Sequence, residues 1–250
     1  MIRNIFAAGC FSILVSMSAW VHAEDFVMVP GEMRGCKLAE GASMNDLNAT
    51  MATTVEWLKA DEHGYELWSA TPHFLPNEGY DFDMLWMGFW TSHAEQMRGL
   101  KAFYTTEAGR QIGAALNQVL DCSNMRHFNS VRLRSDAGED DRQQGFGNMF
   151  DCALEENKGP QDVADVFQKW NRYLDANGID HGVSALFPSS GSTEEAAGTF
   201  KVLWGGDFAD VGKTLEFLTK PESIATWQKI IQRTYSCDTF DRGYFFQRYH

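Results

Sequence analysis

Apolar and aromatic residues gather in short runs along this chain, and one of these runs occurs twice. Phe82–Trp90 reads Phe-Asp-Met-Leu-Trp-Met-Gly-Phe-Trp, and Phe200–Phe208, 118 residues later, repeats its Phe, Leu-Trp and Gly letters. Each run is about nine residues long and ends at polar residues, so it is too short for a membrane span and indicates a β-strand. Apolar side chains alternate onto both faces of the first strand, which therefore needs cover on both sides.

Helical spacing of apolar residues appears twice in each half of the chain. Ser43 and Ser92 begin the first two helical segments with capping-box patterns, and Pro160 begins the third. The second and fourth segments contain breaks, at Thr106 and at Pro221. We expect each broken segment to form two shorter helices.

Strand-like runs lie between the helical segments, four in each half. They are Arg34–Ala39, Tyr65–Phe74, Phe82–Trp90, Met125–Arg134, Phe146–Leu154, Val183–Pro188, Phe200–Phe208 and Gly243–His250. Each half therefore runs β-α-β-β-α-β, the order of the ferredoxin-like fold, in which one antiparallel sheet carries two helices on one face. We predict an α+β protein of two tandem ferredoxin-like repeats, residues 24–134 and 146–250. The acidic segment 135–145 has almost no apolar content and is the predicted linker.

The arrangement of the two predicted sheets follows from their aromatic strands. Sheet can pack on sheet as a barrel while the helices cover the outside. We therefore expect the two antiparallel sheets to pack together as an intramolecular pseudo-dimer, with their tryptophan-bearing faces buried against each other.

The first 23 residues have the pattern of a secretory signal peptide. Arg3 precedes an apolar core, and Val21-His22-Ala23 forms a small-x-small cleavage site. Cys10 hints at a lipoprotein signal, but the apolar stretch before it is too brief. We expect export to the periplasm or the extracellular space, with no membrane insertion after cleavage. The formal net charge of −13 repels phosphate backbones and anionic lipid, which disfavours nucleic-acid binding and membrane-surface docking.

Four further cysteines occupy matching places in the two halves. Cys36 and Cys152 lie in the opening strand of each repeat, and Cys122 and Cys237 lie where each second helix ends. In the ferredoxin-like sheet the last strand lies antiparallel beside the first, which brings the end of the second helix close to the far part of the first strand. We predict the disulfides Cys36–Cys122 and Cys152–Cys237, which an oxidising compartment permits. A metal site or four free thiols is the rival interpretation, and no Cys-x-x-Cys spacing supports a metal site.

Histidines and tryptophans are the candidates for chemistry. His63 and His181 occupy matching places before the second strand of each half, either as acid–base or metal groups or as cations that satisfy the last carbonyls of a helix. Trp86, Trp90 and Trp204 could line an apolar cavity between sheet and helices, or could simply be core. No histidine spacing predicts a metal site, and no nucleophile-elbow, phosphate-loop or dinucleotide motif occurs.

The order of elements, the duplication and the broken second helix together resemble the dimeric α/β-barrel superfamily. The break is Thr105-Thr106-Glu107 in one half and Lys220-Pro221-Glu222 in the other. This superfamily includes antibiotic-biosynthesis-monooxygenase-like domains and the haem-binding chlorite-dismutase-like proteins. The resemblance is one of layout, and no catalytic motif of these families maps onto particular positions here.

Two hypotheses for the function follow. The first is an exported small-molecule-binding or structural module, with a small apolar ligand and no predicted cofactor, either a monomer or a homo-oligomer. The alternative, which the resemblance implies, is an oxygenase-like enzyme, cofactor-free or haem-dependent, that acts on a small apolar or aromatic substrate. In that case Trp86 would line the pocket and His127 would transfer a proton. A shared fold does not by itself carry an activity with it.

Overall fold

A computed structural model describes residues 26–60, 64–75, 81–123, 125–136, 142–190, 196–238 and 242–249 of the chain. In order, the elements are β1 (Met28–Leu38), α1 (Met44–Ala60), β2 (Tyr65–Phe74), β3 (Met84–Trp90), α2 (His93–Thr105), α3 (Glu107–Val119), β4 (Leu120–Cys122), β5 (Arg126–Arg134), β6 (Gln144–Leu154), α4 (Pro160–Ala176), β7 (Gly182–Pro188), β8 (Thr199–Gly206), α5 (Phe208–Leu218), α6 (Pro221–Ile231), β9 (Tyr235–Cys237) and β10 (Arg242–Arg248). The expected signal peptide, the central part of the expected linker and His63 lie outside the described residues.

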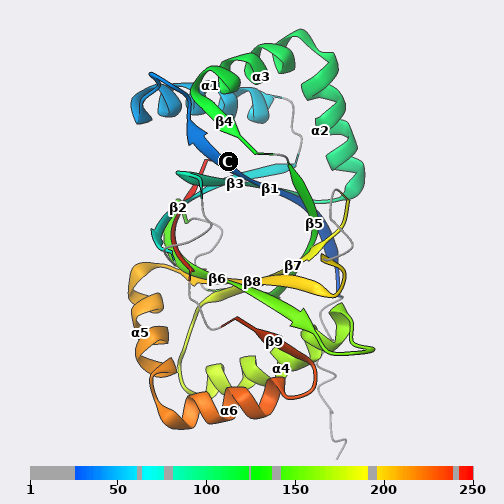
Figure 1. The fold of residues 1–250 in the computed structure, drawn as a ribbon, viewed down its shortest axis with the longest axis vertical. Coiled ribbons are helices and arrows are strands. Elements are labelled where there is room, and N and C mark those ends of the chain that lie inside the picture. The colour runs from blue at the N-terminus through cyan, green and yellow to red at the C-terminus, as the bar shows by residue number, and fades with distance from the viewer. Residues whose placement is uncertain are drawn as a thin grey trace, which may run out of the picture.

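The eight longer strands form one closed sheet, which is seen end-on as a ring in Figure 1. The strand order is β2-β3-β1-β5 in the first half and β7-β8-β6-β10 in the second, with antiparallel neighbours throughout. β5 pairs with β7, and β10 pairs with β2, so the halves join edge to edge at two seams. This closure pairs the strand edges that two separate sheets would leave open. The prediction of two fused ferredoxin-like repeats that form a barrel is confirmed.

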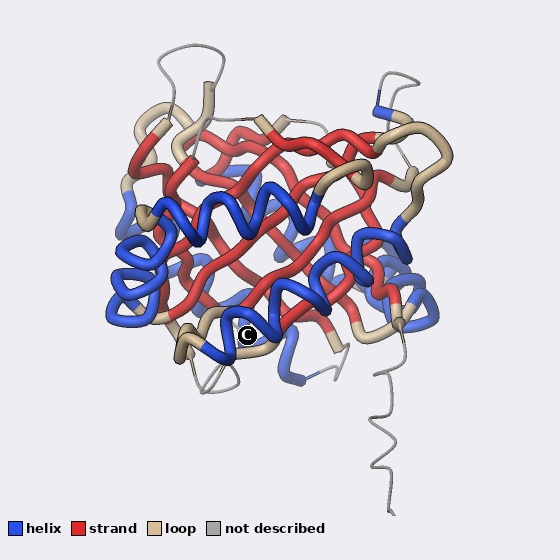
Figure 2. Tube along the Cα trace, turned by 90° about the horizontal axis from the view of Figure 1, so that it is seen from below, coloured by secondary structure: helices blue, strands red, loops and turns tan. Residues whose placement is uncertain are grey.

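Helices cover two opposite sides of the barrel. α1, α2 and α3 lie over the sheet of the first half, and α4, α5 and α6 lie over that of the second (Figure 1). Figure 2 shows helices lying across the outer face of the strands. Among the described residues, no helix combines the length and the apolar character that a bilayer crossing requires.

Local capping fixes where the helices begin and break. At the start of α1, the Ser43 backbone N–H and hydroxyl both donate to Asp46, as the capping-box pattern predicted. Thr106 ends α2, and its Oγ1 accepts the Gly109 N–H at 3.0 Å to begin α3. Such a cap contributes about 1 kcal/mol. The second break is also confirmed, because α6 starts at Pro221.

The tryptophan-bearing faces of the two sheets point outward to the helices, so the expectation that they pack against each other is wrong. Trp86 and Trp90 belong to the core between the first sheet and its helices, and Trp204 to the equivalent core of the second half. The interior of an eight-stranded barrel is only wide enough for inward side chains to fill it. The buried side chains of that interior are Met33, Ala70, Leu85, Met87, Phe128, Met149, Leu186 and Tyr244, and Trp68, Phe82, Phe89 and Phe246 pack against them.

The sequence repeat is two residues out of register with the structural repeat. Cys36 lies opposite Met84, and Cys152 lies opposite Phe200, so equivalent positions are 116 residues apart and not 118. Because side chains alternate along a strand with a period of two, this shift keeps every residue on its expected face. The fold prediction therefore survived an alignment that paired the wrong residues.

Two short strands that the sequence did not predict contain a cysteine each. β4 and β9 follow α3 and α6 directly, and each pairs with the opening strand of its half. They place Cys122 opposite Cys36 and Cys237 opposite Cys152. Both predicted disulfides are present, with sequence separations of 86 and 85 residues. In the chain-entropy model a loop of that length stabilises the fold by roughly 4–5 kcal/mol.

The first strand begins earlier, and the repeated strand of the second half ends earlier, than expected. β1 starts at Met28, six residues before the expected start. The prediction missed this part of the strand because Pro30 and Gly31 are typical of loops. Pro30 is tolerated where β1 is paired with β5 but not yet with β3. β8 stops at Gly206, and Asp207 then caps α5 through its carboxylate. Phe208 is therefore an exposed first residue of a helix and not a strand residue.

Candidate functional site

A cavity of about 260 Å³ lies between the sheet of the first half and its helices. The floor is made by Glu32 and Arg34 from β1, Tyr65 from β2, and Trp86 and Trp90 from β3. The helices add mainly aromatic and aliphatic side chains to the walls. An apolar pocket with a few converging polar groups is the usual form of a small-molecule site.

Three side chains from three adjacent strands form a hydrogen-bonded chain on this floor. The Trp86 Nε1–H donates to the Tyr65 hydroxyl oxygen at 3.0 Å, and the Tyr65 hydroxyl donates to Glu32 Oε1 at 2.8 Å. The three residues are 4%, 8% and 6% exposed, respectively. The chain of donors therefore ends on a carboxyl group that is almost completely withdrawn from bulk water.

A glycine makes this chain possible. β3 lies between β2 and β1, so the Tyr65 side chain has to cross β3 to reach Glu32. It does so over Gly88, which lies directly opposite Glu32 in the sheet. A Cβ atom at position 88 would come within 2.0 Å of the tyrosine oxygen. The site therefore requires glycine at that position.

Burial controls the proton equilibria on the floor. It raises the pKa of Glu32 above the ordinary 4.5, although the hydrogen bond from Tyr65 and the charges of Arg34 and His127 oppose the rise. Burial, followed by the nearby Glu32 charge, raises the pKa of Tyr65 well above 10.0. Tyr65 therefore keeps its proton, whereas Glu32 is a carboxyl group made more basic by its surroundings.

Arg34 is the cation of the cavity lining. Its guanidinium carbon lies 5.4 Å from the centre of the Trp86 ring, a cation–π arrangement. Among the described residues, nothing accepts a hydrogen bond from its buried Nε, and no carboxylate lies within ion-pair distance of it. A donor of this kind without an acceptor is costly in a folded protein unless a ligand supplies the acceptor.

His127, the residue suggested for proton transfer, lies beside this site and not in it. It is the cross-strand neighbour of Glu32 and sits 3.3 Å from Gln96 of α2 through Nδ1. Gln96 in turn lies 3.3 Å from His93. His127 influences the charge of Glu32 but does not line the cavity.

His181 and Trp204 belong to the second half and do not line this cavity. His181 is 4% exposed, its Nδ1 lies 3.1 Å from Thr214 Oγ1, and its ring centre lies 5.3 Å from that of Trp204. Burial, and then the charge of Arg134, lower the pKa of His181 to about 4. The lowered pKa of His181, together with Thr214 as the partner of its Nδ1, argues against its interpretation as a helix-end cation.

The second half has no copy of the floor. Counted 116 residues along the chain, the counterparts are Asn148 for Glu32, His181 for Tyr65 and Trp204 for Gly88. The position that glycine leaves open in the first half thus carries an indole in the second. That indole is 7% exposed in a tightly filled aromatic core.

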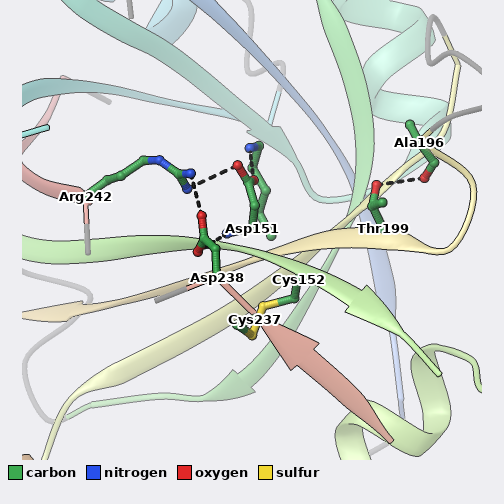
Figure 3. Close-up of polar contacts among 8 residues, drawn as sticks. Asp151, Cys152, Ala196, Thr199, Cys237, Asp238 and Arg242 are labelled. Atoms are coloured by element: carbon green, nitrogen blue, oxygen red, sulfur yellow. Dashed lines mark hydrogen bonds and ion pairs between the residues drawn. A yellow bond between two sulfur atoms is a disulfide. The ribbon is translucent and has the colours of Figure 1, made fainter. Parts of the chain in front are cut away.

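A larger cavity, of about 750 Å³, lies at one end of the barrel beside the disulfide Cys152–Cys237. Asp151, Asp238 and Lys201 line it, together with Arg126 and His127. Arg242, which lies outside the lining, is 3.1 Å from Asp151 and 2.5 Å from Asp238 (Figure 3), and Lys201 also pairs with Asp151.

The described side chains do not favour a metal site, and those of the first cavity do not favour haem. Among the described residues, no group of three or more His, Cys, Asp or Glu side chains converges on a point. Haem iron is usually held by His, Cys, Met or Tyr. The lining of the first cavity contains no histidine or cysteine, and its buried Tyr65 already donates to Glu32. The other lining residues of a haem-ligand type are Met125 and the exposed Tyr104. At about 260 Å³ the cavity is also too small to enclose a haem, although it can hold a smaller molecule. This lining therefore does not fit haem.

Comparisons by sequence find no relative: no family model matches the chain, and no curated protein matches it. Solved structures do match. A provisionally assigned monooxygenase from Lactobacillus acidophilus NCFM has a TM-score of 0.55 and 7% identity, over 89% of this chain and 94% of that one. A haem-binding protein from Thermus thermophilus has a TM-score of 0.47 and 10% identity, over 89% and 92%. The chlorite dismutase of Candidatus Nitrospira defluvii in complex with imidazole has a TM-score of 0.44 and 10% identity, over 88% and 91%.

Proposed function

We propose that this chain, a dimeric α/β-barrel protein of two fused ferredoxin-like halves, is an exported binding protein for a small aromatic molecule. The first match among those reported above shares the fold but only 7% of the sequence, so the activity has to be argued from the site. The ligand would occupy the cavity of the first half, between the sheet and helices α1 to α3.

The observation that carries this proposal is the buried chain from Trp86 through Tyr65 to Glu32 on the floor of an otherwise apolar cavity. Withdrawing a carboxyl group from water costs on the order of a few kcal/mol, and apolar replacements of buried polar groups often stabilise a fold. The second half stabilises the corresponding region with a filled aromatic core instead. A polar floor that costs stability is understandable if it orients a ligand.

The size of the cavity limits the ligand. An apolar cavity of about 150 Å³ holds benzene. The present one, at about 260 Å³, suits a molecule of one or two fused rings. Trp57, Trp86, Trp90 and Phe103 would contact the ring faces and edges.

Filling the cavity tests this proposal. Calorimetric titration with 1-naphthol should give binding to the wild-type protein, and Leu116→Trp should weaken it at least about tenfold, because Leu116 lines the cavity and the indole would occupy it. Leu218→Trp places the same bulk on a partly buried leucine of the second half and serves as the control. Equal binding by wild type and Leu116→Trp would place the ligand elsewhere and reject the proposal.

A second candidate, cofactor-free oxygenation, is favoured by the raised pKa of Glu32 in an apolar cavity, a condition typical of a general base. Glu32 would accept the hydroxyl proton of 1-naphthol, and the naphtholate would react with dioxygen. One oxygen atom would enter the ring to give 1,4-naphthoquinone, and the other would leave as water. An oxygen electrode should then show uptake that Glu32→Gln abolishes, and no uptake above the protein-free rate would leave binding as the function.

A further inference from the structure

We propose that the ligand of the first-half cavity carries a carboxylate or a similar oxyanion, which the guanidinium of Arg34 receives. This inference rests on the proposed binding function and adds the chemical class of the ligand. The inference is based on the geometry of the cavity and on its single guanidinium, which has no carboxylate partner among the described residues.

Arg34 differs from three other mostly buried arginines of the chain, because each of those pairs with a carboxylate. Arg134 lies 2.7 Å from Asp175, Arg142 lies 2.5 Å from Asp136, and Arg242 lies 3.1 Å from Asp151. Arg34 instead faces the Trp86 ring, and among the described residues no carboxylate lies within ion-pair distance of it. Its buried Nε, like that of Arg134, has no acceptor among the described residues, but of these two only Arg34 also lacks a carboxylate partner. A carboxylate is the acceptor that best matches the planar fork of a guanidinium.

Few titratable side chains line the cavity. β1 contributes Glu32 and Arg34, β2 contributes Tyr65, and α2 contributes Tyr104, whereas the residues lining from α1, β3 and α3 carry no charge. Glu32 already accepts the hydrogen bond of Tyr65, and it does not lie within ion-pair distance of Arg34. The full positive charge that faces the cavity is therefore that of Arg34.

The floor also separates the two ends of such a ligand. The rings would lie among the indoles, and the acid group would lie over β1. Arg34 and Glu32 are two residues apart on this strand and therefore share its outer face. A charged Glu32 would repel the acid group at this distance, whereas a protonated Glu32 would not. Binding of an acid should therefore be accompanied by proton uptake at Glu32, and its affinity should rise as the pH falls.

The experiment compares three probes of one shape by calorimetric titration: 1-naphthoate, 1-naphthol and 1-naphthylamine. The wild-type protein should bind 1-naphthoate about tenfold or more tightly than 1-naphthol, the ratio expected for one charge-assisted contact. Arg34→Met should remove this advantage, so that the variant binds 1-naphthoate and 1-naphthol with affinities within about threefold of each other. Arg110→Met changes an exposed arginine of α3 that pairs with Glu107, and it should leave both affinities unchanged.

The proposals fail separately. If 1-naphthol or 1-naphthylamine binds at least as tightly as 1-naphthoate, or if Arg34→Met leaves 1-naphthoate binding intact, the cavity binds aromatic molecules but the oxyanion assignment is wrong. If none of the three probes binds at millimolar concentration, the proposed function is rejected and the oxyanion assignment with it. A second readout is the pH profile: Glu32→Gln should flatten the pH dependence of 1-naphthoate affinity, and a profile equal to that of the wild type would reject the coupling to Glu32.

Discussion

The hydroxyl oxygen of Tyr65 lies 2.0 Å from the point where a Cβ atom of residue 88 would stand, so the tyrosine occupies space that only Gly88 leaves open. One strand thereby lets a side chain of its neighbour cross it to a third strand. The Glu32 carboxyl group receives its hydrogen bond through this crossing. Position 88 would usually hold a side chain that packs in the core, but here its glycine allows the hydrogen bond on which the chemistry of the cavity depends.

Replacing Gly88 by alanine should therefore destabilise the protein, although alanine is otherwise the better strand residue. The clash with Tyr65 should cost about 1–3 kcal/mol, more than the roughly 0.5–1 kcal/mol gained from reduced backbone entropy. Chemical denaturation measures the difference. Gly212→Ala is the control, because nothing lies within 4 Å of a Cβ there and the helix should become slightly more stable. An unchanged free energy of unfolding for Gly88→Ala would contradict the crossing.

Removing the hydroxyl of Tyr65 should leave two buried groups without partners. Tyr65→Phe deprives Glu32 of its donor and Trp86 of its acceptor, at a cost of about 1–3 kcal/mol in the free energy of unfolding. The pKa of Glu32 should rise further, because the hydrogen bond that lowers it is lost. Tyr104→Phe removes the hydroxyl of an exposed tyrosine and should change neither quantity. Carboxyl titration by NMR, followed at Glu32, distinguishes the two variants.

Glu32 should also give the stability a recognisable dependence on pH. Its pKa is raised in the folded state, so the folded protein holds a proton that the unfolded chain has released. Stability is therefore fully present below the ordinary pKa of 4.5 and falls as the pH rises from there through the raised value. In Glu32→Gln this decline should be absent, and the variant should be at least as stable as the wild type at pH 7. Denaturation curves at pH 4 to 8 test this, and the same slope in both proteins would refute it.

His181 acts on stability in the opposite range of pH. Its folded-state pKa is about 4, against an ordinary 6.5, so the unfolded chain binds a proton that the folded protein excludes. The stability is complete above pH 6.5 and is lost as the pH falls toward 4, by roughly 3 kcal/mol. His181→Gln keeps a hydrogen-bonding group for Thr214 and should remove this loss. Acid denaturation of His181→Gln at the same midpoint as the wild type would show that other groups dominate.

The two disulfides offer a matched pair of variants. Cys36→Ala with Cys122→Ala, and Cys152→Ala with Cys237→Ala, each open a loop of nearly the same length. Each double variant should lose roughly 4–5 kcal/mol, and the two losses should be similar. Mass mapping of the intact protein under non-reducing conditions should recover the two peptide pairs. A peptide that joins Cys36 to Cys152 would contradict the structure.

Much of the fold was available from the sequence, because it is encoded by patterns of short period. Alternation located the strands and gave the face of each residue even where the repeat was aligned two residues out of register. The positions of the cysteines then selected the disulfides. Alternation does not predict whether a face of the sheet is covered by helices or by the opposite side of the barrel. The placement of Trp86, Trp90 and Trp204 against the helices, and not inside the barrel, depended on how much space the closed sheet leaves.

The candidate site was harder to predict than the fold. Glu32 and Arg34 alternate with Gly31, Met33 and Gly35, a pattern that favours a strand with one wet face. The face becomes dry only because three helices cover it. The sequence signal that could have found the site is a glycine flanked by large residues in an aromatic strand, Met87-Gly88-Phe89, because a missing side chain there implies that another residue lies across it.

The two seams of the barrel have a consequence for any attempt to separate the halves. β5 needs β7 and β10 needs β2 as hydrogen-bonding neighbours, and in both pairs the strands come from different halves. A fragment that ends after β5, or one that begins with β6, would carry two bare rows of backbone donors and acceptors. Co-expressed fragments should therefore recover each other as a non-covalent complex, whereas each fragment made alone should self-associate, with a second copy of itself standing in for the missing half.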